Sequence, residues 1–91
     1  MLFYLPKPPP AAMRVKGTPE QLAKFYHLYQ ETIWPGYAAH PRYINSREAR
    51  IAKKSIESGE LIVCTSRAMK LAADMAYKAV FIDPEPENSG G

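Results

Sequence analysis

The sequence predicts a small, mainly α-helical protein in which a three-helix domain lies between an extended, Pro-rich N-terminal arm and an acidic C-terminal tail. The chain has 91 residues, enough for one hydrophobic core. Six of its nine prolines lie within the first ten or the last eight residues, so both ends are expected to be extended. Between the ends, apolar residues recur at the spacing of amphipathic helices. We therefore assign residues 1–16 to the arm, residues 17–83 to the helical domain and residues 84–91 to the tail.

The N-terminal arm combines an apolar tip with a stiff stalk. Residues 6–10 contain four prolines, which fix φ and remove backbone donors, so polyproline II geometry is expected there. Because such an arm cannot fold on itself, it is either a free terminal segment or a docking arm that lays its tip on a partner protein. The tip consists of Met1, Leu2, Phe3, Tyr4 and Leu5.

The first helix has the clearest start signal in the sequence. Thr18 supplies an N-cap hydroxyl, Pro19 takes the first helical position and Gln21 completes a capping box. Pro35 disfavours helical geometry at the residue before it, so the helix is expected to end near residue 33. The apolar stripe that is expected to face the core consists of Leu22, Phe25, Tyr26, Tyr29 and Ile33.

Residues 34–43 are predicted to form a loop, because two prolines and a glycine interrupt any regular element. The loop is rich in aromatic side chains, which either fold back over the edge of the core or form an exposed contact surface. These side chains are Trp34, Tyr37 and Tyr43.

A second helix is predicted from Asn45 or Ser46 to the residue before Gly59, with Ile44 as a hydrophobic staple. Its apolar stripe of Ala49, Ala52 and Ile56 is thin, so we expect this helix to rest on the surface of the protein. Its exposed sides carry Arg47, Arg50, Lys53 and Lys54.

The apolar run 61–64 is predicted to be buried, either as a short strand or as a connector. A third helix follows, capped by Thr65 or Ser66 and ending at about Phe81. Its inward stripe is expected to contain Ala68, Leu71, Ala72, Met75, Ala79 and Ile82.

Positive charge is concentrated in the body of the protein. The net charge is +3, but all twelve basic residues and only six of the nine acidic ones lie in residues 1–82, which carry +6. A basic cluster beside Tyr37 and Tyr43 has the composition that neutralises phosphates and stacks on bases. The same cluster also suits an acidic protein surface, anionic lipid head groups or a merely solvated helix face. It consists of Arg42, Arg47, Arg50, Lys53 and Lys54.

The sequence offers little for catalysis or metal binding. Cys64 lies in an apolar run, where a buried, inert thiol is expected, and His27 and His40 lack the short paired spacings of zinc sites. We therefore predict no catalytic residue, no metal and no cofactor. Four charges within residues 61–82 argue against a transmembrane span, and a single cysteine favours a reducing, intracellular compartment, with an organelle such as the mitochondrion included.

These observations predict a non-catalytic accessory or structural subunit of a larger protein assembly. It would bind neighbouring subunits through its extended ends and its basic helix, as small basic subunits of respiratory complexes and ribosomes do by analogy. The alternative is a small RNA- or DNA-binding module that uses the basic cluster, and a stand-alone regulator or enzyme comes third.

Overall fold

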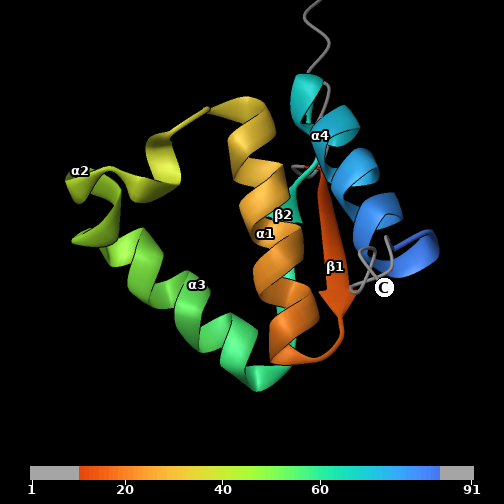
Figure 1. Ribbon diagram of the computed structural model, residues 1–91, viewed down its shortest axis with the longest axis horizontal. Coiled ribbons are helices and arrows are strands. Elements are labelled where there is room, and N and C mark those ends of the chain that lie inside the picture. Colours follow the sequence, from red (N-terminus) through yellow and green to blue (C-terminus); the bar gives the residue numbers. More distant parts are fainter. Residues whose placement is uncertain (1–10, 85–91) are drawn as a thin grey trace, which may run out of the picture.

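The computed structural model describes residues 11–84, which form a mainly helical body packed on one face of a small two-stranded sheet (Figure 1). The predicted tip Met1–Leu5 and residues 85–91 of the predicted tail lie outside the described residues. The elements are, in order, β1 (Ala12–Lys16), α1 (Pro19–Ile33), a 3₁₀ turn (Tyr37–Ala39), α2 (Pro41–Ile44), α3 (Arg47–Ser58), β2 (Glu60–Cys64), α4 (Ala68–Tyr77) and a π-helical turn (Lys78–Ile82).

The predicted first helix is confirmed as α1, with its capping box. The Gln21 backbone N–H donates to Thr18 Oγ1 at 3.1 Å, and the Thr18 backbone N–H donates to Gln21 Oε1 at 3.0 Å. Leu22 and Phe25 are completely buried, and Tyr29 is buried as well. The capping box fixes where α1 begins, and the buried apolar stripe places the helix at the centre of the fold.

The sheet corrects the predicted boundary of the N-terminal arm. Residues Ala12–Lys16, assigned to the arm from the sequence, form β1 and pair antiparallel with β2, so that Val15 lies opposite Leu61 and Met13 opposite Val63. Val15 is fully buried. The folded domain therefore begins at Ala12 at the latest rather than at residue 17. The sequence predicted the wrong boundary because β1 is a strand only through its pairing with β2, which lies far along the chain.

Strand β2 settles the open alternative for residues 61–64 and corrects their predicted burial. Because successive side chains of a strand point to opposite faces, Leu61 and Val63 are buried, whereas Ile62 and Cys64 lie exposed on the open face. The expectation of a buried thiol at Cys64 is therefore wrong.

The predicted loop 34–43 contains a further helix, so the described residues hold four α-helices instead of the expected three. In α2, Pro41 takes the first helical position and the Arg42 backbone N–H donates to His40 Nδ1 at 3.1 Å. An imidazole N-cap and a proline at the first position thus support a single helical turn inside the segment predicted to be a loop.

Helix α3 lies at the surface, as predicted from its thin stripe. Ser46 is the N-cap, accepting the Ala49 backbone N–H at 3.2 Å, and Gly59 ends the helix with φ of 88°. Only Ala52 is buried in this helix. The predicted staple is absent, because Ile44 is exposed.

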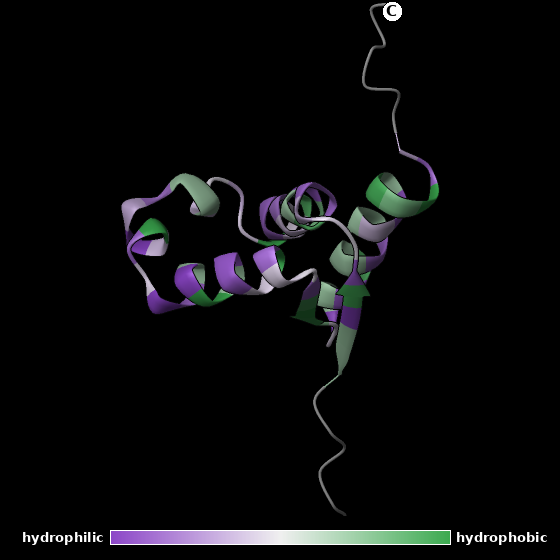
Figure 2. Cartoon of the chain, turned by 90° about the horizontal axis from the view of Figure 1, so that it is seen from below, coloured by the Kyte–Doolittle hydropathy of each residue, from purple (hydrophilic) through white to green (hydrophobic). Residues whose placement is uncertain are grey.

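Helix α4 turns a different face to the core than the sequence predicts. The α-helix ends at Tyr77 rather than near Phe81, and the π-helical turn follows it. The buried side chains are Ala72, Ala73 and Ala76 in α4 and Val80 in the turn, so of the predicted inward stripe only Ala72 is correct. Small alanine side chains let α4 approach α1 closely. The hydrophobic end of this helix is visible in Figure 2, where the chain leaves α4 towards the C-terminus.

The predicted cap of α4 is also wrong. Neither Thr65 nor Ser66 supplies a side-chain cap, and the helix starts after Arg67, which has a positive φ of 54°. The Ser66 hydroxyl instead lies 3.0 Å from Cys64 Sγ, in hydrogen-bonding contact.

Candidate functional site

The residues predicted to bind a partner lie largely on one side of α1. Within the described residues, Trp34 and Tyr37 follow the end of α1, Arg42 and Tyr43 belong to α2, and the remaining basic residues belong to α3. Figure 1 shows α2 and α3 together on the side of α1 that faces away from α4. We call this side the α2–α3 side.

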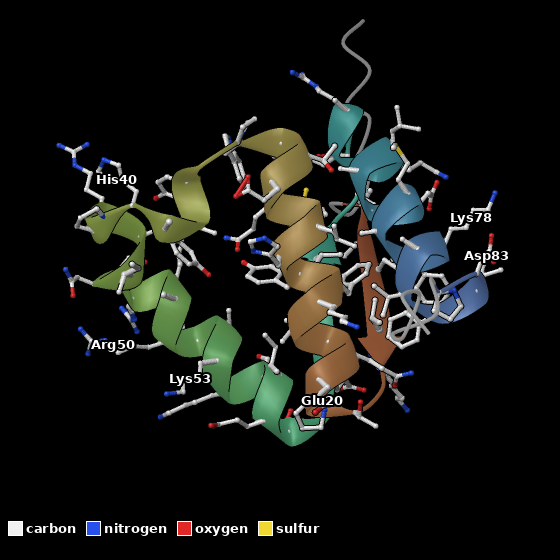
Figure 3. The ribbon with its side chains drawn as sticks, in the orientation of Figure 1. Glu20, His40, Arg50, Lys53, Lys78 and Asp83 are labelled. Atoms are coloured by element: carbon white, nitrogen blue, oxygen red, sulfur yellow. The ribbon has the colours of Figure 1, made fainter. Side chains whose placement is uncertain are left out.

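The basic cluster of the α2–α3 side is exposed, and none of its members forms an ion pair with another described residue. Figure 3 shows Arg50 and Lys53 pointing away from the body of the protein. The ion pairs between described residues involve Glu60 and Asp74 as acids, and none includes a member of this cluster. Its five cations are therefore available to an anionic partner. The members, all exposed, are Arg42, Arg47, Arg50, Lys53 and Lys54.

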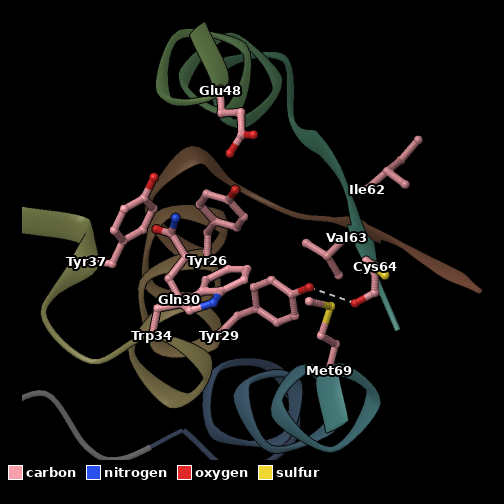
Figure 4. Close-up of a pocket in the computed structure, with 10 residues that line it drawn as sticks. All are labelled: Tyr26, Tyr29, Gln30, Trp34, Tyr37, Glu48, Ile62, Val63, Cys64 and Met69. Carbon is pink, nitrogen blue, oxygen red and sulfur yellow. Dashed lines mark hydrogen bonds between the residues drawn. The ribbon is translucent and has the colours of Figure 1, made fainter. Parts of the chain in front are cut away.

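A pocket of about 540 Å³ opens between α1, the start of α3, β2 and the start of α4 (Figure 4). Its one residue from α3 is the acidic Glu48, and no member of the basic cluster lines it. Its walls are mostly aromatic and aliphatic. They are formed by Tyr26, Tyr29, Gln30, Trp34, Tyr37, Glu48, Ile62, Val63, Cys64 and Met69.

The aromatic walls are held by ring contacts. The rings of Tyr26 and Tyr29 stack with centroids 6.0 Å apart, and those of Trp34 and Tyr37 meet edge to face at 6.1 Å. The aromatic side chains of the predicted loop differ in burial, so they do not all fold back over the core or all form an exposed contact surface. Tyr43 is buried outside the main core cluster, with its ring 5.3 Å from the Tyr37 ring between centroids. Tyr37 is half-buried, and Trp34 is 44% exposed and lines the pocket.

The polar groups of the pocket are mostly neutral. Tyr29 Oη donates to the Cys64 carbonyl at 2.7 Å, and burial raises the pKa of Tyr29. Burial raises the pKa of Tyr26 as well, with contributions from Tyr43 and then the Glu48 carboxylate. Both phenols therefore stay protonated at neutral pH, and the pocket suits an apolar or aromatic group better than a phosphate.

Sequence reasoning missed most of the pocket. Tyr26 and Tyr29 were assigned to the core stripe of the first helix, yet each presents part of its ring to the pocket. Gln30 is buried although it is polar, and it lies next to that stripe. The polar Gln30 beside the aromatic stripe of α1 was the one sign in the sequence of a pocket at this place. The wall that faces α1 comes from β2 and α4, and no local sequence pattern predicts where these elements lie.

The three residues considered for catalysis, His27, His40 and Cys64, have different surroundings in the structure. His27 is exposed on α1, and His40 uses Nδ1 to cap α2. Hydrogen bonding to Ser66 lowers the pKa of the Cys64 thiol, which faces solvent. Among residues 11–84, no three His, Cys, Asp or Glu side chains lie close enough together to hold a metal ion.

In the same part of the chain, no helix has the length and apolar character that crossing a membrane requires. No family model, curated protein or solved structure matches this chain.

Proposed function

We propose that this chain is a non-catalytic accessory subunit of a larger protein assembly and that it binds a neighbouring subunit through the α2–α3 side. The observation that carries this proposal is the exposed Trp34 indole at the rim of an aromatic pocket of about 540 Å³. Tryptophan and tyrosine supply much of the binding energy in protein interfaces, and an open pocket beside them receives an apolar side chain of the partner.

The basic cluster, on the same side of α1 as Trp34, favours a partner that also carries acidic residues. Arg50 and Lys53 project into solvent without an ion pair to another described residue. Opposite charges on a partner increase the rate of association and fix its orientation. The predicted apolar tip Met1–Leu5 supplies a second contact in this proposal. A location in an organelle such as the mitochondrion rests on analogy with small basic subunits of large complexes.

Replacing Trp34 with alanine tests the pocket. Loss of a tryptophan hot spot costs at least about 2 kcal/mol of binding free energy, so we expect the partner to bind about 30-fold more weakly. The measurement is quantitative mass spectrometry of proteins that co-purify with the tagged full-length chain. Ile44→Ala is the matched control, because Ile44 is 56% exposed on the same side but does not line the pocket.

Three results decide this test. The Trp34→Ala and Ile44→Ala variants must both melt near the wild-type temperature, which shows that the fold is intact. Selective loss of one protein from the Trp34→Ala sample supports the proposal. Equal recovery of the same proteins from all three samples would contradict it.

A second candidate function is binding to RNA or DNA, and the five exposed basic residues favour it. If they contact phosphates, the logarithm of affinity for an RNA duplex should fall linearly with the logarithm of salt concentration. Each substitution such as Arg50→Gln or Lys53→Gln should then lower the slope by about one, whereas Lys78→Gln, in the π-helical turn after α4, should leave it unchanged. We expect weak binding that is lost at physiological salt. Tight binding under those conditions would favour this second function, and anionic vesicles in a parallel assay test the lipid alternative.

A further inference from the structure

The pocket between α1, α3, β2 and α4 holds a buried side-chain amide without a hydrogen-bond partner. Gln30 is only 4% exposed and lines the pocket. No hydrogen bond joins its amide to another residue of 11–84. Its polar atoms are nevertheless not sealed off from the surface. Because a buried amide costs free energy until its donors and acceptor are paired, this amide indicates where a polar group of a ligand enters.

The charge that lines the pocket is negative. Glu48 supplies a carboxylate from the first turn of α3, and none of the described lining residues is Lys, Arg or His. Figure 4 shows the Glu48 carboxylate and the Gln30 amide directed toward the same space, next to the rings of Tyr26 and Tyr37. Glu48 forms no ion pair with another described residue. The pocket therefore disfavours an anion and offers an unused carboxylate to a cation.

The aromatic walls add to the attraction for a cation. The face of an aromatic ring carries the negative part of its quadrupole, and a cation over this face is attracted, most strongly by tryptophan. Burial raises the pKa of Tyr26 and of Tyr29, so both phenols stay neutral and their rings offer apolar contact. The four aromatic residues of the lining are Tyr26, Tyr29, Trp34 and Tyr37.

Among the cations that proteins carry, arginine fits this set of groups better than lysine. Its guanidinium is planar and stacks on aromatic rings, whereas the ammonium of lysine is a compact and strongly hydrated point charge. The five N–H groups of a guanidinium can donate to the Glu48 carboxylate and to Gln30 Oε1 at the same time. The aliphatic stem of arginine buries apolar surface, which suits the aliphatic part of the pocket wall.

We propose that this pocket is a receptor for an arginine side chain of the partner. The inference rests on the proposed function and specifies its anchor, which is apolar along its stem and cationic at its tip. The contact is then complementary in both signs of charge. The arginine meets Glu48, and acidic residues of the partner meet the basic cluster on the same side of α1. Two contacts of opposite sign fix the orientation of the partner and disfavour a reversed one.

Binding of side-chain analogues to the full-length chain tests the chemistry of the pocket. The probe is N-propylguanidinium, and N-propylurea has nearly the same shape without the charge. Trp34 is the single tryptophan of the chain, so its indole N–H resonance and its fluorescence report from the pocket. We expect N-propylguanidinium to bind with a dissociation constant on the order of 1 mM, and N-propylurea to bind at least fivefold more weakly. Equal binding of the two overturns the proposal, as does tighter binding of n-butylammonium or p-cresol.

Two substitutions test the polar groups of the pocket. Glu48→Gln should weaken N-propylguanidinium binding at least fivefold. Glu57→Gln is the matched control, because Glu57 is an exposed glutamate of the same helix that does not line the pocket. Gln30→Met keeps the size of the side chain without the amide, and it should weaken binding about threefold. Melting temperatures near that of the wild type show that the variants are folded. Equal affinities of the Glu48→Gln and Glu57→Gln chains contradict the proposal.

Co-purification with the same variants separates this inference from the proposed function. We expect the Glu48→Gln chain to lose the protein that the Trp34→Ala chain loses, and the Glu57→Gln chain to retain it. Recovery of every protein with the Trp34→Ala chain contradicts the proposed function, whether or not the analogues bind. A protein that is lost by the Trp34→Ala chain but retained in full by the Glu48→Gln chain contradicts the arginine anchor alone.

Discussion

Replacing Phe25 with alanine is expected to destabilise the domain by roughly 3–5 kcal/mol. Phe25 is completely buried, and its ring lies 6.2 Å from the Tyr29 ring, 6.5 Å from the Tyr77 ring and 6.3 Å from the Phe81 ring, measured between centroids. It therefore joins α1 to α4 and to the π-helical turn. Because neighbouring rings cannot all move into the space left by the truncation, a cavity remains. The loss is comparable with the whole folding free energy of a small domain, about 5–15 kcal/mol.

Urea unfolding followed by circular dichroism measures this loss. The control is Leu28→Ala on the same helix, where the side chain is 39% exposed and a loss below about 1 kcal/mol is expected. If Phe25→Ala costs no more than Leu28→Ala, then the face of α1 that packs against α4 is not the one described above.

Local chemistry explains why part of the fold was predictable from the sequence. The α1 start depends on Thr18, Pro19 and Gln21, which interact within four consecutive residues. The end of α3 depends on Gly59, whose left-handed φ of 88° favours glycine. Neither feature requires knowledge of any distant segment, so both follow from the order of residues alone.

The strand β1 was not predictable in this way. Its two inward positions, Met13 and Val15, give too short an alternation to predict a strand. What makes the segment a strand is hydrogen bonding to β2, which follows after three helices. Non-local pairing of this kind leaves no signal within a short window of sequence.

Helix α4 shows a different limit, because it has two apolar stripes. The spacing of apolar residues predicts an inward stripe that includes Leu71 and Met75 together with Ala72. The structure buries the alanine stripe through Ala72 and Ala76 instead. Close helix packing against α1 depends on side-chain size at the contact, and hydrophobicity alone does not report it.

The candidate site, like the fold, was predictable from the sequence only in part. The exposed Trp34 and the basic residues of α3 were identifiable from composition and helical spacing. The pocket was not, because Met69 of α4 and Cys64 of β2 close it from segments distant from α1. Half-buried rings such as Tyr26 add a further difficulty, since one apolar stripe then serves both the core and the pocket.

Deleting residues 1–16 is expected to abolish cooperative folding, whereas deleting residues 1–10 should leave the melting temperature nearly unchanged. The shorter deletion keeps the whole of β1 and the hydrogen bond from the Thr65 backbone N–H to the Ala11 carbonyl, which is 3.0 Å long. The longer deletion removes the partner strand of β2. It also removes Val15, whose burial alone is worth about 1.5–3 kcal/mol, and it exposes Leu61 and Val63. A single strand cannot replace the lost backbone hydrogen bonds.

Thermal melts of the two truncated chains beside the full-length protein measure this difference, and Val15→Asp in the full-length chain provides a control that removes no residues. It should unfold the domain as the longer deletion does, because a buried, unpaired carboxylate costs several kcal/mol.

The chain without residues 1–10 should keep its fold. Co-purification with this shortened chain therefore measures the contribution of the apolar tip Met1–Leu5 to partner binding alone. We expect it to recover much less of the partner assembly than the full-length chain. A folded 1–16 deletion would show that β1 is dispensable, and normal assembly of the 1–10 deletion would show that Met1–Leu5 does not bind the partner.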